Sequence, residues 1–230
     1  MDRGHDHRNL QGGGARAAVF GVSDGLVSNV ALILGVAGAH SSASAVRLAG
    51  LAGLVGGAFS MAAGEYVSMR AQSELMEREL DVERKAIDHD PEDERRELAA
   101  IYKSRGLDHD MAEELSVKMM RDPELALETH AREELGINPS ETGNPLQAAA
   151  SSFVAFAIGA VIPLLPWLFT SGTKATLWSV VLGAVAAVTV GAALAVFTGR
   201  SWFWSAGRQL LISGVAAGIT YGIGHVLGGG

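Results

Sequence analysis

Two carboxylates stand inside long apolar stretches of this 230-residue chain, where an ionisable group is costly and therefore suggests a function. They are Asp24 and Glu65. Met61, Glu65 and Met69 are four residues apart, so they share one face of a helix. A carboxylate flanked by thioethers can bind a borderline divalent cation. The alternatives are that the carboxylates cap or snorkel near the membrane surface and that the methionines only pack.

A second group of candidate ligands lies in an acidic segment, residues 71–147. Carboxylates three or four residues apart project from one face of a helix, and such pairs converge in the carboxylate–histidine metal sites of helical bundles. The pairs in this segment are Glu79/Glu83, Glu94/Glu97 and His130/Glu134. Because the segment holds 14 Glu, pairs also arise by chance, and a solvated acidic face is the alternative.

The charges of the chain are concentrated in this segment. Residues 71–147 contain 21 of the 25 acidic and 10 of the 18 basic side chains, a net charge of −11, and all other residues together carry +4. A soluble protein cannot leave so much sequence nearly uncharged, because its surface must be polar. A bilayer core needs about 20 apolar residues per helix. Five such stretches are present, at residues 19–39, 46–69, 148–169, 175–198 and 209–227. The sequence therefore predicts an all-α membrane protein with five transmembrane helices and a helical insert between the second and third.

Lys and Arg near the ends of the spans predict the orientation, because they are enriched on the cytoplasmic side. With the N-terminus inside, that side receives the insert and most other basic residues, and the opposite side receives Arg47 and Lys174. We therefore expect a cytoplasmic tail at 1–18, transmembrane helices at 19–70, a cytoplasmic metal-binding domain at 71–147 and transmembrane helices at 148–230. The short, Ala- and Gly-rich chain favours a bacterial plasma membrane, with a vacuole-like membrane as the alternative.

Local signals predict how the insert and the spans are built. Asp followed by Pro marks a helix start, and Gly marks an end. Four helices are expected in the insert: one that continues the second span to residue 87, one at 91–106, one starting at Asp108 or Asp110, and one at 123–136. Glycines at four-residue spacing permit close helix packing, within one chain or across a dimer. They occur at Gly21/Gly25, Gly53/Gly57, Gly214/Gly218/Gly222 and Gly224/Gly228.

Two of the spans carry motifs of a known family. The first contains Ser23-Asp24-Gly25-Leu26-Val27-Ser28, and the second is the Gly-rich segment 50–68 with Phe59-Ser60-Met61. With the charged insert and Ile162-Pro163-Leu164-Leu165-Pro166 in the third span, they resemble the vacuolar iron transporter family over nearly the whole chain. The resemblance implies five spans per protomer, a homodimer, and export of Fe²⁺, often with Mn²⁺, from the cytosol in exchange for protons.

The same resemblance assigns roles to residues. It implies that Asp24 and Met61 line the pathway at the dimer interface and that the insert supplies Glu and Met ligands. The insert residues that match are Glu94, Glu97 and Glu134 by motif, with Glu79 and Glu83 as the best match on the first helix.

This chain departs from the family at three places. A Glu that some members carry eight residues before the pathway Met is Gly53 here, and a Pro in some members' first span is Asn29. The Met pair of the last insert helix falls at His130 and Ala131. An imidazole in place of a thioether suits Fe²⁺, Mn²⁺ or Zn²⁺, so the preferred metal stays open.

These features together predict a proton-coupled transporter of Fe²⁺ and Mn²⁺. The insert would collect the metal and deliver it to the pore mouth near Glu65, and Asp24 and Met61 of both protomers would bind it in the membrane. A carboxylate in a low dielectric favours its neutral form unless a cation is present, so metal and proton would compete for Asp24. Zn²⁺ or Co²⁺ are alternative cargoes, and no tightly bound cofactor is expected.

Other classes of protein fit less well. The absence of Cys excludes thiolate chemistry, and the acidic insert has the wrong sign for nucleic acid. A ferritin-like oxidase needs Glu-x-x-His motifs, which the insert does not contain, so no enzymatic activity is expected. The remaining alternative is a membrane-anchored metal-binding or sensing module that transports nothing.

Overall fold

The computed structural model describes residues 13–139 and 143–228. Most of the predicted N-terminal tail, 1–18, lies outside these residues. The described chain contains eight helices and no strand, which confirms the all-α prediction. It divides into two compact units, one formed by the described residues up to Val67 and from Pro145 on, and the other by Ser68–Asn144. We call them the span unit and the insert unit.

The span unit contains α1 (Gly13–Gly38), the first part of α2 (Ala43–His89), α6 (Pro145–Phe169), α7 (Gly172–Thr198) and α8 (Trp202–Gly228). Each of these five helices includes a stretch long and apolar enough to cross a membrane, as the sequence predicts. The sequence predicts the last two spans at 175–198 and 209–227, which leaves residues 199–208 between them, and this gap is too long. Gly199, at φ +66°, ends α7 in the left-handed conformation that glycine adopts most easily, and α8 begins three residues later at Trp202.

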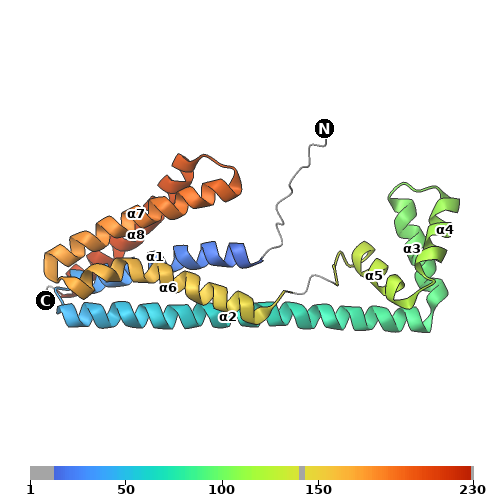
Figure 1. Ribbon diagram of the computed structural model, residues 1–230, viewed down its shortest axis with the longest axis horizontal. Helices are drawn as coiled ribbons and strands as arrows, with labels where there is room; N and C mark the ends of the chain where they lie inside the picture. The colour runs from blue at the N-terminus through green and yellow to red at the C-terminus, as the bar shows by residue number, and fades with distance from the viewer. Residues whose placement is uncertain (1–12, 140–142, 229–230) are drawn as a thin grey trace. The chain divides into compact units, whose positions relative to one another are not determined.

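Glycine faces allow the helices of the span unit to approach closely. Helix α1 packs most extensively against α6, and the two ribbons lie side by side in Figure 1. A Cβ added at Gly25 would lie 2.1 Å from the main-chain oxygen of Phe156, and one added at Gly159 would lie 2.1 Å from that of Val22. These contacts leave no room for a side chain, so this glycine face packs within one chain.

The other glycine repeats differ in their surroundings. Gly224 and Gly228 of α8 lie against the C-terminal end of α1 and the residue that follows it, since an added Cβ would be 1.9 Å from the Gly35 main-chain oxygen and 2.3 Å from the Ala39 Cα, respectively. By contrast, a Cβ added at Gly214, Gly218 or Gly222 meets no atom within 4 Å in the described part of the chain. The face formed by Gly224 and Gly228 therefore packs within the chain. The face formed by Gly214, Gly218 and Gly222 packs against none of the described residues.

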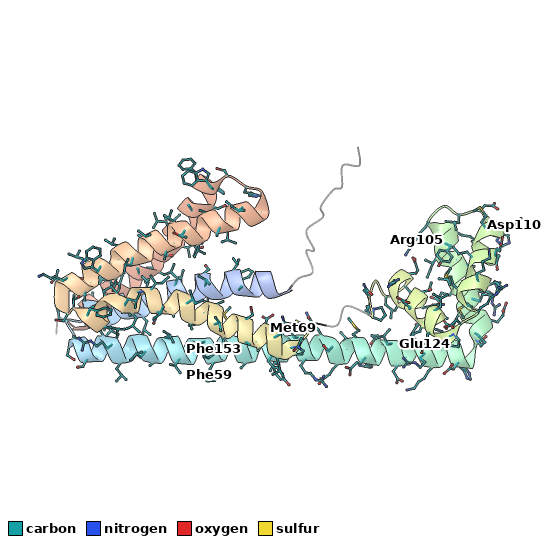
Figure 2. The ribbon with its side chains drawn as sticks, viewed as in Figure 1. Phe59, Met69, Arg105, Asp110, Glu124 and Phe153 are labelled. Carbon is teal, nitrogen blue, oxygen red and sulfur yellow. The ribbon has the colours of Figure 1, made fainter. Side chains whose placement is uncertain are left out.

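Helix α2 joins the span unit mainly through side chains. Val46 and Ala58 are fully buried, and Arg47 Nε donates a hydrogen bond to the main-chain oxygen of Trp167 at 2.6 Å. Phe59 of α2 and Phe153 of α6 meet edge to face with ring centroids 5.1 Å apart, and Figure 2 shows the two rings together.

The insert unit consists of the rest of α2 with α3 (Pro91–Ser104), α4 (His109–Met119) and α5 (Pro123–Glu133). Asp90 and Asp122 cap α3 and α5 as predicted, the first accepting one backbone N–H group of its helix and the second accepting two. Asp108, not Asp110, caps α4, because its carboxylate accepts the N–H of Asp110. Helix α5 ends three residues before Gly136, earlier than predicted. A small core of Leu98, Tyr102 and Ala112 joins α3 to α4.

Candidate metal sites

A cavity of about 300 Å³ lies among α1, α2 and α6 within the span unit. Its wall includes Asp24 and Ser28 of α1 and Met61 of α2. Two of the three predicted pathway residues, Asp24 and Met61, therefore line the same cavity. Glu65, the third, is half-buried and lies one turn beyond Met61 on α2, outside the residues that line this cavity.

Two polar residues of this cavity are accessible in the isolated chain. Asp24 and Ser28 are both exposed, and Ser28 Oγ donates a hydrogen bond to the main-chain oxygen of Asp24 at 2.6 Å. Ser28 thus does not occupy the Asp24 carboxylate. A carboxylate, a thioether and a hydroxyl at one cavity wall can bind a divalent cation that has lost part of its hydration shell. A charged side chain on this surface needs a protein or water neighbour, because lipid cannot solvate it.

Asn29 is a further polar residue at this cavity, and the sequence marked it only as a departure from the family. It is 1% exposed, and its Nδ2 donates a hydrogen bond to the main-chain oxygen of Ala160 at 2.6 Å. Its Oδ1 has no hydrogen-bond partner among the described residues. An amide in an otherwise apolar stretch is the signal that could have identified it as a functional candidate.

A second site lies entirely within the insert unit. Glu83 of α2, Glu94 of α3, His130 of α5 and Glu134 at the C-cap of α5 each offer one ligand atom, and these atoms all lie within 4.8 Å of one another. The structure thus brings together four of the six residues that the sequence suggests as insert ligands. They come from three helices, so their convergence depends on how the helices pack.

The imidazole of His130 is the centre of this cluster. It is fully buried, and its Nδ1 lies 3.0 Å from Glu83 Oε1, 3.7 Å from Glu94 Oε2 and 3.5 Å from Glu134 Oε2. Neither Nδ1 nor Glu83 Oε1 has a hydrogen-bond partner among the described residues. Three carboxylates around one ring nitrogen of an imidazole form a donor set of one nitrogen and several oxygens. Such a set suits Fe²⁺, Mn²⁺, Co²⁺ and Zn²⁺.

The electrostatics of the cluster favour a cation. Burial raises the pKa of Glu83 from 4.5 to about 7, with repulsion from Glu134, Glu94 and Glu97 adding to the effect. Burial is also the main reason that the pKa of Glu94 is raised. A group that holds a proton because it is buried among like charges also gains from a metal ion in the proton's place.

Of the 17 other acidic residues described in the insert unit, eight form ion pairs with Lys or Arg. Glu113 binds Arg95 and lies 3.1 Å from Lys103 Nζ, which ties α3 to α4, and Arg105 binds Glu133 of α5. Within the described residues, no Lys or Arg forms an ion pair with Glu83, Glu94 or Glu134. The cluster is therefore a concentration of negative charge without a Lys or Arg partner, whereas about half of the other described carboxylates of the unit have one.

Two predicted insert ligands do not join the cluster. Glu97 is exposed, and its charge raises the pKa of Glu83 and Glu94, but it is not part of the four-residue group. Glu79 is half-buried and lies one turn before Glu83 on α2, about 6 Å along the helix axis. The four-residue spacing placed Glu79 and Glu83 on one face, but only Glu83 lies at the level of His130.

The fold and the two sites define a helical multi-pass membrane protein with side chains suited to binding divalent cations. Comparison with known proteins makes the assignment specific, because the model of the VIT family matches residues 15–225. The chain belongs to the VIT family.

Its relatives match it over most of their length. It is 35% identical over 230 residues to the vacuolar iron transporter of Acanthamoeba castellanii, which covers 97% of this chain and 83% of the relative. It is 30% identical over 224 residues to the vacuolar iron transporter of Centaurea cyanus, covering 97% and 91%. With vacuolar iron transporter 1 of Oryza sativa subsp. japonica the identity is 32% over 221 residues, covering 95% and 88%. The predicted family is confirmed, and so is its assignment as a transporter family and not an enzyme.

Proposed function

We propose that this protein moves Fe²⁺, and Mn²⁺ as well, out of the cytosol in exchange for protons. The observation that carries the proposal is the cavity shared by Asp24 and Met61 in a chain whose relatives are named vacuolar iron transporters. A carboxylate and a thioether at one cavity wall of a membrane-spanning unit combine a hard and a soft donor, as a borderline divalent cation requires.

Coupling to protons follows from the charge of Asp24. In a low-dielectric environment an ionised carboxylate is costly, so either a proton or a metal ion must neutralise it. The two ions are then alternative occupants of one group. A metal ion leaving Asp24 is replaced by a proton, and a proton leaving it is replaced by a metal ion.

The insert unit supplies the first binding site for the metal. Glu83, Glu94, Glu134 and His130 hold the ion, and the pathway residues Asp24, Met61 and Glu65 receive it. Glu79 and Glu97 add negative charge near the cluster and raise the local cation concentration. Because the donor set suits Zn²⁺ and Co²⁺ as well, these ions are alternative cargoes.

The functional unit is a homodimer with the N-terminus and the insert in the cytoplasm. The exposed Asp24 and Ser28 support the dimer, since a second copy over this surface would replace lipid with polar protein groups. The excess of Lys and Arg on the insert side of the spans supports the orientation. The composition favours a bacterial plasma membrane, and the names of the relatives keep a vacuole-like membrane as the alternative.

Uptake of metal into proteoliposomes with an imposed proton gradient tests this function. We expect gradient-dependent uptake of Fe²⁺ and Mn²⁺ by the wild type and none by Asp24→Asn, which keeps the shape of the side chain but removes its charge. Asp110→Asn is the matched control, because Asp110 is an exposed residue of the first turn of α4 in the insert unit. Proton-coupled uptake retained by Asp24→Asn would refute the mechanism.

The alternative function is a membrane-anchored metal sensor, and the insert cluster by itself favours it. This alternative predicts metal binding that is lost in Glu83→Gln, together with no gradient-dependent uptake by well-folded wild type.

A further inference from the structure

Asn29 presents a polar atom that the fold of the span unit does not use. Its Nδ2 is occupied by the hydrogen bond to Ala160, which fixes the orientation of the planar carboxamide. Oδ1 therefore points away from that carbonyl, and it has no partner among the described residues. An unsatisfied buried acceptor destabilises the folded protein, because it has lost its hydrogen bonds to water. A membrane span has little water to compensate that cost, so a polar ligand for Oδ1 would relieve it.

The position of this atom connects it to the cavity. Asn29 lies in the cavity wall with Asp24 and Met61, and it follows Asp24 by five residues on α1, about 7 Å along the axis. Its Oδ1 lies over Gly53 of α2, since a Cβ added at Gly53 would be 2.7 Å from Oδ1. The missing side chain at position 53 therefore leaves the space in which the amide oxygen sits.

Other buried polar atoms without partners lie elsewhere. Ser152 Oγ and Trp167 Nε1 belong to residues that do not line this cavity, and Ser213 Oγ belongs to a separate apolar cavity of about 530 Å³ between α1, α7 and α8. Among the described residues, Asn29 is the one that lines the cavity of Asp24 and also has a buried side-chain atom without a partner.

We propose that Asn29 is a further metal ligand of the membrane pathway, binding the transported divalent cation through Oδ1 at the level of Gly53, in the cavity that Asp24 and Met61 also line. The inference rests on the proposed function and deepens it. A neutral oxygen adds coordination without adding charge, and sites with fewer charged ligands hold divalent cations less tightly. Asn29 therefore tunes the affinity so that the ion binds and still leaves within one transport cycle.

Two substitutions at position 29 separate this role from packing. Asn29→Leu keeps the approximate volume and removes the oxygen, so the KM for Mn²⁺ uptake should rise about tenfold with little change in maximal rate. Asn29→Asp keeps an oxygen and adds a charge, so KM and maximal rate should both fall, because the ion binds more tightly and leaves more slowly. A role in packing alone would not shift KM in opposite directions.

Gly53 provides a second, independent perturbation. Gly53→Ala places a methyl group 2.7 Å from Oδ1 and displaces the amide, so it should raise KM as Asn29→Leu does. Gly56→Ala is the matched control on the same helix, since a Cβ there meets no described atom within 4 Å, and its KM should equal that of the wild type.

The controls make the result decisive. Ser213→Ala removes another buried atom without a partner and should leave KM unchanged, and thermal unfolding followed by Trp fluorescence checks that each variant is folded. If the wild type transports Mn²⁺ and Asn29→Leu keeps the wild-type KM, or if Asn29→Leu and Asn29→Asp shift it in the same direction, the inference is wrong and the proposed function stands. Absence of uptake by the wild type overturns both.

Discussion

The raised pKa of Glu83 predicts how the stability of the metal-free insert unit depends on pH. Its carboxyl is 9% exposed, and its pKa is about 7 in the folded protein against 4.5 for the ordinary side chain. The folded insert thus binds this proton more tightly than the unfolded chain does. The contribution of Glu83 to stability is greatest below pH 4.5, decreases as the pH rises through this interval, and levels off above pH 7. The difference corresponds to about 3 kcal/mol.

Replacing the carboxylate should remove this loss. Without metal, Glu83→Gln should stabilise the insert unit by up to about 3 kcal/mol at a pH well above the folded pKa, and it should have little effect below pH 4.5. The same variant should lose metal affinity, because it removes the negative charge of the carboxylate closest to His130 Nδ1. One substitution therefore increases stability and decreases binding, which distinguishes a metal ligand from a structural carboxylate.

Hydrogen exchange measured on the full-length protein in detergent with chelator tests this prediction. All four Trp lie outside 68–144, so their fluorescence does not report on the insert, whereas exchange of α3–α5 amides does. At alkaline pH, amides that exchange through opening of the insert unit should slow by about two orders of magnitude in Glu83→Gln. Glu77→Gln, an exposed position on the same helix, should leave exchange unchanged. Equal exchange in Glu83→Gln and wild type would refute the reasoning.

Three further predictions follow from single contacts. His130→Ala should weaken Co²⁺ binding to the full protein at least tenfold, seen by titration calorimetry, because the fully buried imidazole faces all three carboxylates; unchanged affinity would exclude it as a ligand. Gly25→Ala should sharply reduce the yield of folded protein, since its Cβ would lie 2.1 Å from the Phe156 oxygen, whereas Gly214→Ala should be tolerated. Asp122→Ala should destabilise α5 by about 1 kcal/mol, because its carboxylate accepts two backbone N–H groups, and Asp122→Asn should recover most of the loss in exchange measurements.

Many features of the fold depend on nearby residues, and the sequence predicted these well. The length and composition of five apolar stretches predicted five span helices, because the thickness of a bilayer sets the length that an apolar helix needs. Asp90 and Asp122 were identified as caps because a side chain that caps a helix bonds to N–H groups two or three residues away. The sequence offered both Asp108 and Asp110 as the cap of α4, and the structure shows that Asp108 is the cap.

Helical spacing also identified candidate ligands, but not which of them meet. It placed Glu79 and Glu83 on one helix face and made both candidate ligands. The structure brings only Glu83 to His130, which is 47 residues away in the chain. Periodicity determines the neighbours of a residue within its own helix, whereas the rotation and level of one helix against another depend on side-chain packing between them. The sequence by itself determined the spans, the caps and the types of candidate ligand. Only the tertiary structure decided that Glu83, Glu94, His130 and Glu134 converge, and that the Asn29 oxygen lies over Gly53 in the cavity of Asp24, because both depend on contacts between separate helices.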